Sequence, residues 1–300
     1  MDEQGKVGTM RPSRTEWIAG GTRVELGGRS LFYRQDGPAD GRPVTLLHGY
    51  PTSSHDWASV LPALVESGCR VTLLDFLGFG ASAKPRGHDY RFTEQADLVQ
   101  ALWNHLGIEA TALVAHDYGV SVAQELLARD PDRITRMAWL NGGLYADLYR
   151  PMAIQKLMAS PLGKLLGPLM SETSYRMSIH RTLGRPLSDA EVHQMWLATS
   201  SDGGTRIQWD LNRYHAERRA NADRWRKSLE SYSGPTMFVW GPADPISGEQ
   251  LSRLRERLPA ARFVVLDEPP VVGHWPQLED PGVVGPALAE FLRDGAQDSN

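Results

Sequence analysis

The chain has 300 residues, of which 41% are hydrophobic and 23% are charged, so it is long enough to bury a substantial core. Its formal net charge of -4 excludes the basic surface expected of proteins that bind nucleic acid or anionic membranes. Cys69 is the single cysteine, which excludes an intramolecular disulfide, and we expect a buried free thiol in a cytoplasmic protein.

Residues 1–21 form a polar leader without the apolar stretch of a signal peptide or membrane helix, and we expect this leader to be frayed. Two short strands follow at residues 22–26 and 29–33. The pair Gly27-Gly28 between them is typical of a tight hairpin turn. After the leader, the sequence therefore predicts a β-hairpin.

Strands and helices then alternate along the chain. Nearly continuous apolar runs, typical of strands covered on both faces, occur at residues 43–47, 70–74, 111–115 and 134–140. Helical spacing of apolar residues occurs between them, at residues 54–67, 93–106 and 120–128. This alternation predicts the α/β class, with an open, mostly parallel, doubly wound sheet.

The strand pattern stops between residues 143 and 233, where Leu, Met, Arg, Trp and Tyr residues interrupted by prolines predict several short helices. We interpret this segment as a helical lid, or cap, inserted above the site. Strands return at residues 236–240 and 262–266, with helices at 248–257 and 283–292. Residues 22–142 and 234–295 are therefore predicted to form one core.

Asp117 stands at the apex of a strand, a tight turn and a helix, in the segment AHDYG at residues 115–119. This arrangement is typical of a nucleophile elbow, which exposes one reactive side chain above the sheet and usually carries serine. A serine that attacked a saturated carbon would leave a stable ether, whereas an aspartate leaves an ester that water can cleave. Asp117 therefore predicts displacement at an sp3 carbon followed by ester hydrolysis.

An acid and a base follow in the order nucleophile, acid, histidine that such elbows use. Asp244 comes directly after the strand at 236–240, and His274 comes after the strand at 262–266. Because parallel strands end at one edge of a sheet, we expect both to meet Asp117 there. The other position for the acid, after the strand at 134–140, carries Asn141, and Asp147 further on is a poorer candidate.

Two backbone amides are expected to form an oxyanion hole, because Tyr50 follows a core strand and Tyr118 follows the nucleophile directly. We expect His48 to be a buried residue that organises its loop. The glycine pattern at residues 75–80 lacks the third glycine of a dinucleotide site, and the chain has no HExxH or CxxC spacing. We therefore expect neither a cofactor nor a metal.

Together these residues resemble the α/β-hydrolase superfamily and, within it, the branch of epoxide hydrolases and haloalkane dehalogenases that uses an aspartate nucleophile. The blocks that carry the resemblance are HGYPTSSHDW, DFLGFGASAKP, AHDYG and GHWPQLEDP, at residues 48–57, 75–85, 115–119 and 273–281. They also look similar to the subgroup of the mesoderm-specific transcript protein and its bacterial relatives. The resemblance implies an α/β-hydrolase fold over nearly the whole chain, from about residue 24 to residue 292.

Two positions distinguish the branches of this resemblance. Dehalogenases typically hold the departing halide with a tryptophan after the nucleophile and an asparagine after His-Gly, or a second tryptophan, whereas this chain has Tyr118 and Tyr50 there. Epoxide hydrolases protonate the epoxide oxygen with lid tyrosines, because an alkoxide is a poor leaving group unless an acid meets it. Tyr214 lies in a segment similar to the one that carries such a tyrosine, which favours the epoxide branch.

The other lid residues are assigned less specifically. For a second lid tyrosine the first half of the lid offers Tyr145, Tyr149 and Tyr175, and we take Tyr175 as the candidate. Trp196 and Trp209, with the Leu and Met content of the lid, predict an apolar substrate pocket, although the same residues can simply pack the lid onto the core.

The resemblance implies an enzyme in which Asp117 attacks an epoxide carbon and Tyr214 protonates the oxygen. His274, oriented by Asp244, then activates the water that hydrolyses the ester to a diol. The expected partners are a small apolar substrate and water, in a monomer or homodimer. The alternatives are a haloalkane dehalogenase, a lactone or ester hydrolase of the same fold, and a ligand-binding protein that keeps the three catalytic residues.

Overall fold

The sheet consists of a hairpin followed by six parallel strands. The computed structural model describes residues 11–293, and its strand order is β1-β2-β4-β3-β5-β6-β7-β8. Strand β2 is antiparallel to both of its neighbours, and all the other neighbouring pairs are parallel. The strands are β1 (Thr22–Leu26), β2 (Arg29–Asp36), β3 (Arg42–Leu47), β4 (Cys69–Leu74), β5 (Thr111–His116), β6 (Ile134–Leu140), β7 (Thr236–Trp240) and β8 (Arg262–Val265). The predicted α/β fold class is confirmed.

The hairpin turn and the start of β4 lie where the sequence predicts them. Gly27 and Gly28 have φ values of 54° and 72°, which L-residues with a side chain rarely adopt, and they place Leu26 opposite Arg29 in the hairpin. Cys69 is a free, fully buried thiol at the first residue of β4, as predicted.

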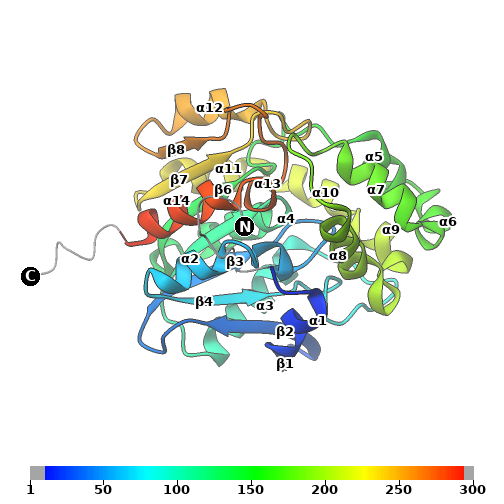
Figure 1. The fold of residues 1–300 in the computed structure, drawn as a ribbon, viewed down its shortest axis with the longest axis horizontal. Helices are drawn as coiled ribbons and strands as arrows, with labels where there is room; N and C mark the ends of the chain where they lie inside the picture. Colours follow the sequence, from blue (N-terminus) through cyan, green and yellow to red (C-terminus); the bar gives the residue numbers. More distant parts are fainter. Residues whose placement is uncertain (1–10, 294–300) are drawn as a thin grey trace, which may run out of the picture.

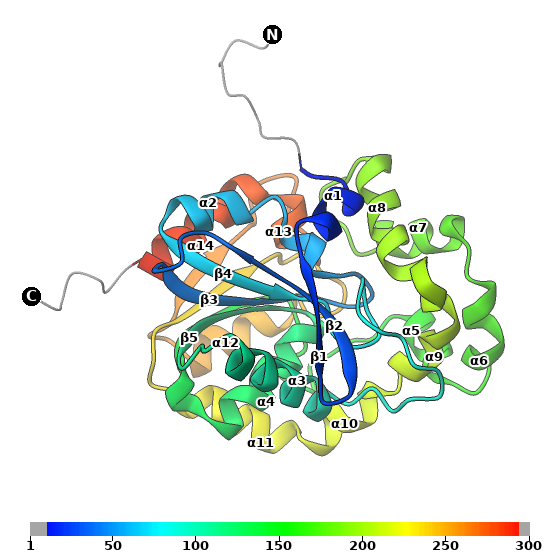
Figure 2. The same cartoon turned by 90° about the horizontal axis from the view of Figure 1, so that it is seen from below.

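Helices cover both faces of the sheet (Figures 1 and 2). One face carries α2 (Leu61–Glu66) and α14 (Pro281–Arg293). The other face carries α3 (Phe92–His105), α4 (Tyr118–Arg129), α11 (Ala222–Ser231) and α12 (Gln250–Arg257). The two layers bury separate apolar clusters, which explains why the central strands read as continuous apolar runs.

The helix predicted at residues 54–67 is two elements. Residues Ser54–Trp57 form a short 3-10 helix, η1, and α2 begins only at Leu61. Pro62 lies in the first turn of α2, where the missing N–H costs nothing, whereas an uninterrupted helix would need that donor. The prediction of one continuous helix was therefore wrong.

The segment between β6 and β7 is helical and, apart from α11, gathers beyond the carboxyl ends of the strands (Figure 1). It comprises α5 (Ala153–Ala159), α6 (Gly163–Leu166), η3 (Gly167–Leu169), α7 (Glu172–His180), α8 (Asp189–Ser200), η4 (Ser201–Ile207), α9 (Gln208–Leu211), α10 (Tyr214–Ala220) and α11. Helices α7 and α8 pack onto Trp275 and Leu278 of the core. Within residues 11–293, no helix is both long and apolar enough to cross a membrane.

A helix precedes the hairpin where the sequence predicted only a frayed leader. Helix α1 (Arg14–Ala19) begins with a capping box, in which Ser13 and Glu16 satisfy each other's backbone amides. Trp17 is only 2% exposed, and its indole N–H donates to Ser54 at 3.0 Å. The backbone N–H of Arg14 donates to the side chain of Gln194 in the lid at 2.7 Å. The prediction was wrong for residues 14–19; residues 1–10 lie outside the described part of the chain.

We expect Trp17→Ala to lower the free energy of unfolding by about 3–5 kcal/mol, because it removes a buried aromatic side chain and leaves a cavity. Urea unfolding followed by circular dichroism measures this loss. The control is Thr15→Ala on the exposed face of the same helix, where we expect a change within about 0.5 kcal/mol. Equal effects of the two substitutions would contradict a structural role for α1.

Candidate active site

Asp117 forms the turn between β5 and α4 by itself. Its φ of 44° and ψ of -103° are unusual for a residue with a side chain, and such a conformation costs about 1–3 kcal/mol. Gly119 allows the close approach of β3, since a Cβ atom there would lie 2.7 Å from the carbonyl oxygen of Leu47. The sequence motif thus produces a sharp, strained elbow with the carboxylate at its apex.

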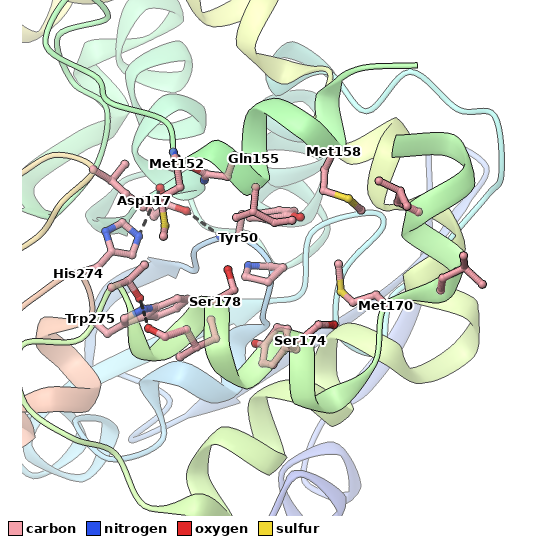
Figure 3. A pocket seen from close by; sticks show the side chains of 18 residues that line it. Tyr50, Asp117, Met152, Gln155, Met158, Met170, Ser174, Ser178, His274 and Trp275 are labelled. Carbon is pink, nitrogen blue, oxygen red and sulfur yellow. Dashed lines mark hydrogen bonds and ion pairs between the residues drawn. The ribbon is translucent and has the colours of Figure 1, made fainter. Parts of the chain in front are cut away.

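The structure brings the three predicted catalytic side chains together from three loops. His274 Nε2 lies 3.7 Å from Asp117 Oδ1 (Figure 3). His274 Nδ1 lies 2.9 Å from Asp244 Oδ2. Asp117, Asp244 and His274 are 3%, 5% and 2% exposed. The histidine therefore stands between two buried carboxylates.

The buried charges reinforce one another. Burial alone would lower the pKa of His274, but the negative charges of Asp244 and Asp117 raise it to about 10. Burial alone would raise the pKa of Asp117, but contact with the protonated His274 holds that pKa well below its usual range. These pKa shifts favour an ionised Asp117 beside a protonated His274 in the free protein at neutral pH.

Asn141 orients the acid. Its side-chain N–H donates to Asp244 Oδ2 at 2.9 Å, and Ser247 donates its hydroxyl to the same oxygen. The backbone N–H of Ile246 donates to Asp244 Oδ1 at 2.8 Å. The alternative acid position of the sequence thus carries an amide that holds Asp244 toward His274.

The loop after β3 points a backbone amide at Asp117, at the place predicted for the oxyanion hole. The backbone N–H of Tyr50 donates to Asp117 Oδ2 at 3.0 Å. Tyr118 is the first residue of α4, so its N–H is one of the amides that have no acceptor within the helix. His48 is fully buried, bonds to the carbonyl oxygen of Gly49, and accepts the N–H of Phe76. His48 organises its loop, as expected.

A cavity of about 280 Å³ opens on Asp117 and His274, between the core and the lid (Figure 3). Within the described part of the chain, no other charged side chain lines it. Most of its wall is apolar and comes from Met152, Ile154, Met158, Leu166, Leu169, Met170, Ile179, Ile246 and Trp275. The indole N–H of Trp275 is already donated to Thr182 at 2.9 Å. The cavity therefore suits an uncharged, largely apolar molecule.

Of the three lid residues that were predicted to contact substrate, one lines the cavity and two do not. Tyr175 lines the cavity with a buried side chain. Trp196 packs against the ring of Tyr175, and Trp209 lies between Lys164 and Arg213; neither is in the cavity wall. These tryptophans pack the lid internally. The Met and Leu residues of short helices form the wall instead, and the sequence indicated them only through the apolar content of the lid.

Tyr214 is buried at the start of α10, outside the cavity wall. Its hydroxyl lies 3.2 Å from that of Tyr149, and its ring centroid lies 6.2 Å from that of Tyr50. Burial raises the pKa of Tyr214 and of Tyr149, and the negative charge of Asp117 adds to both increases. Tyr149 is the phenol that contacts Tyr214, whereas Tyr175 lines the cavity, so the choice of Tyr175 as the second lid tyrosine stays a prediction.

Sequence comparison places this architecture among known proteins. Residues 42–281 match the family described as alpha/beta hydrolase fold. The mesoderm-specific transcript homolog protein of Bos taurus is 36% identical over 291 residues, which cover 91% of this chain and 85% of that protein. A haloalkane dehalogenase of Mycolicibacterium paratuberculosis is 36% identical over 249 residues, which cover 77% of each chain. The predicted resemblance is confirmed.

Solved structures give the same fold at lower identity. A loop variant of a haloalkane dehalogenase from Bradyrhizobium elkanii aligns with a TM-score of 0.76 at 23% identity, covering 91% of this chain and 96% of the other. A Klebsiella pneumoniae protein provisionally described as an epoxide hydrolase aligns with a TM-score of 0.75 at 21% identity, covering 92% and 98%. At these identities the likeness concerns the fold alone.

Proposed function

Because the chain belongs to the α/β-hydrolase family, we propose that it is a hydrolase that opens an epoxide, or a similar electrophilic carbon, through a covalent ester on Asp117. The observation that carries this proposal is the buried arrangement of Asp117, His274 and Asp244, with a carboxylate at the elbow. A carboxylate can displace a leaving group from a saturated carbon and be regenerated by water. The product would be a diol.

The first step uses the ionised carboxylate directly. The N–H of Tyr50 holds Oδ2 of Asp117, so Oδ1 is the oxygen that forms the new bond to carbon. The C–O bond of the epoxide breaks, its electron pair stays on the oxygen, and that oxygen takes a proton from Tyr214, whose hydroxyl must move from its place outside the cavity wall to reach it. Tyr149 supports this role, because its hydroxyl is hydrogen-bonded to that of Tyr214.

The second step needs a neutral histidine. Esterification removes the charge of Asp117, which is one cause of the high pKa of His274, so the pKa of His274 falls. The proton of the imidazolium ion can then replace the proton that Tyr214 lost. His274 then deprotonates a water that attacks the ester carbonyl. The amides of Tyr50 and Tyr118 stabilise the oxyanion. Collapse of the intermediate breaks the bond between the carbonyl carbon and the alkyl oxygen, and the proton of the new carboxyl group passes to that oxygen, which releases the diol and restores ionised Asp117.

Haloalkane dehalogenation is the second candidate, because a dehalogenase is 36% identical to this chain. The side chains near Asp117 favour the epoxide over a haloalkane, because they do not offer the typical donors to a departing halide. Tyr118 and Tyr50 stand at the positions of typical halide-binding side chains, and the indole N–H of Trp275 is bonded to Thr182. A lactone or ester hydrolase, and a protein that only binds its ligand, are further outcomes of the tests below.

We expect Tyr214→Phe to separate the two candidates. Its kcat/KM for a small apolar epoxide should fall about 100-fold, because the alkoxide loses its acid. With a bromoalkane of the same chain length, the rate should stay within about threefold, because bromide leaves without a proton. Diol and bromide release, measured on the same preparations, give both values.

Tyr145→Phe is the matched control, since it removes a buried phenol that lies outside the cavity wall, and it should change epoxide turnover by less than about threefold. An equal loss with both substrates, or a larger loss in Tyr145→Phe, would contradict the role of Tyr214. Faster wild-type turnover of the bromoalkane than of the epoxide would identify a dehalogenase.

A further inference from the structure

Two polar groups in the wall of the catalytic cavity have no hydrogen-bond partner among the described residues. Besides Asp117 and His274, the wall contains side chains that can form hydrogen bonds from Tyr50, Gln155, Ser174, Tyr175, Ser178, Thr182 and Trp275. Most of these groups are already bonded within the protein. The groups that stay free decide which polar atom of a substrate the cavity can recognise.

The bonded groups can be excluded one by one. Tyr50 donates its hydroxyl to one lid side chain and accepts a hydrogen bond from another. Thr182 donates to a backbone carbonyl at 2.7 Å and accepts the indole N–H of Trp275 at 2.9 Å. Ser174 donates to the carbonyl oxygen of the residue that caps α7, at 2.9 Å. The hydroxyl of Tyr175 is unpaired but has almost no accessible surface, so a ligand in the cavity does not reach it.

Gln155 keeps a free amide nitrogen at the cavity. The residue is 8% exposed, and its Oε1 accepts the backbone N–H of Met152 at 2.8 Å, which fixes the orientation of the amide. Within residues 11–293 its Nε2 makes no hydrogen bond, yet this atom is not one of the unpaired atoms that are closed off from accessible space. Met152, Gln155 and Met158 follow at helical spacing and all line the cavity. The Nε2 group is therefore open to the cavity in an otherwise apolar stripe.

Ser178 is the second free group. It lies on α7, lines the cavity, and its hydroxyl forms no hydrogen bond within the described part of the chain and is not closed off from accessible space. Figure 3 shows Gln155 and Ser178 on opposite sides of the cavity, between Asp117 at one end and Met158 and Met170 at the other. Both free groups therefore lie along the course of a substrate chain whose reacting carbon is at Asp117.

We propose that Gln155 and Ser178 bind a carbonyl or ether oxygen of the substrate, separate from the oxygen that reacts; this inference rests on the function proposed for Asp117. The amide Nε2 only donates, so it selects an acceptor. A carbonyl oxygen has two lone pairs and can accept from both side chains. A pure hydrocarbon chain would displace water from both groups and leave them unpaired, which disfavours its binding. The substrate class is therefore an apolar epoxide with one further oxygen acceptor in its chain.

Binding of unreactive ketones tests the role of Gln155 without any chemistry. Isothermal titration calorimetry of the full chain with the three isomeric straight-chain heptanones varies the position of one carbonyl group. We expect at least one isomer to bind saturably. Gln155→Glu should weaken this binding about tenfold, because it keeps the acceptor for the N–H of Met152 and loses the donors. Gln155→Met is uncharged and similar in size, and it should weaken binding to the same extent.

Two matched controls accompany these variants. Gln100→Glu also keeps an acceptor, here for Arg129, but lies outside the cavity wall, and it should change the affinity less than about twofold. Ser178→Ala should weaken binding about threefold, whereas Thr173→Ala at the exposed surface of the same helix should leave it unchanged. If no heptanone binds, or if the wild type and both Gln155 variants bind with equal affinity, the proposal is overturned.

Turnover separates this inference from the proposed function. The substrates are epoxyoctane with a terminal ring and the ethers in which oxygen replaces one methylene group of its chain. We expect kcat/KM of the best ether to exceed that of epoxyoctane about tenfold, and Gln155→Met to reduce this ratio to about one. Conversion of all these epoxides without preference for any ether would overturn the inference alone. Ketone binding that depends on Gln155, without conversion of any epoxide, would overturn the proposed function alone.

Discussion

A His274→Ala variant incubated with a small epoxide is expected to stop at the covalent ester on Asp117. The first step uses Asp117 as an anion and does not need the histidine as a base; because the loss of His274 removes the main cause that lowers the pKa of the buried Asp117, the incubation is run above neutral pH, where the carboxylate stays ionised. Ester hydrolysis does need it, and turnover should fall by about 10³-fold or more. The mass of the intact protein should increase by the mass of one substrate molecule, and peptide mapping should place the increase on Asp117.

Two controls make this trapping experiment specific. Asp117→Asn in the His274→Ala background should show no adduct, because the amide is a poor nucleophile. His88→Ala removes a histidine that pairs with Glu94 at the surface and should leave turnover unchanged. An adduct on another residue, or continued turnover of esters without any adduct, would exclude the proposed mechanism.

The second large effect is expected from Asp244→Asn, which keeps the shape of the acid and removes its charge. Burial would then lower the pKa of His274 without the opposing charge of Asp244, so this pKa should fall well below its wild-type value of about 10. The amide also favours the wrong tautomer of the ring, and kcat should fall by about 10³- to 10⁴-fold. The ester on Asp117 should accumulate because only its hydrolysis is slowed.

An NMR titration of His274 and single-turnover kinetics measure these two effects separately. The matched control is Asp147→Asn, which removes an exposed carboxylate that pairs with Arg253. It should leave both the pKa of His274 and the rate of ester hydrolysis unchanged. An unchanged pKa of His274 in Asp244→Asn would show that Asp244 does not act on the histidine.

The catalytic arrangement was predictable because each part of it is local. The strand before Asp117 and the helix after it are apolar patterns of a few residues, and parallel strands must end at one edge. The positions of Asp244 and His274 follow from that rule together with the chain order nucleophile, acid, histidine. The sequence predicted that both residues lie near Asp117, and the structure supplied the distances between them.

The lid was less predictable because its contacts are tertiary. The hydroxyl contact of Tyr149 with Tyr214 joins residues that are 65 positions apart, and no periodicity records it. Arg218 belongs to the short helix α10 and reads as an ordinary exposed arginine in the sequence, yet it is buried against aromatic rings. Helix α1 was missed because its single buried residue, Trp17, lies in an otherwise polar segment.

The link from helix α1 to the lid has a consequence for sequence changes before the first strand. The backbone of Arg14 is hydrogen-bonded to Gln194, and Trp17 anchors the same helix to Ser54 beside the sheet. The segment before the first strand is thus hydrogen-bonded both to the lid and to the core of the protein. Insertions, deletions or fusion tags in this segment can therefore alter how freely substrate enters and product leaves, while every residue that performs the chemistry stays the same.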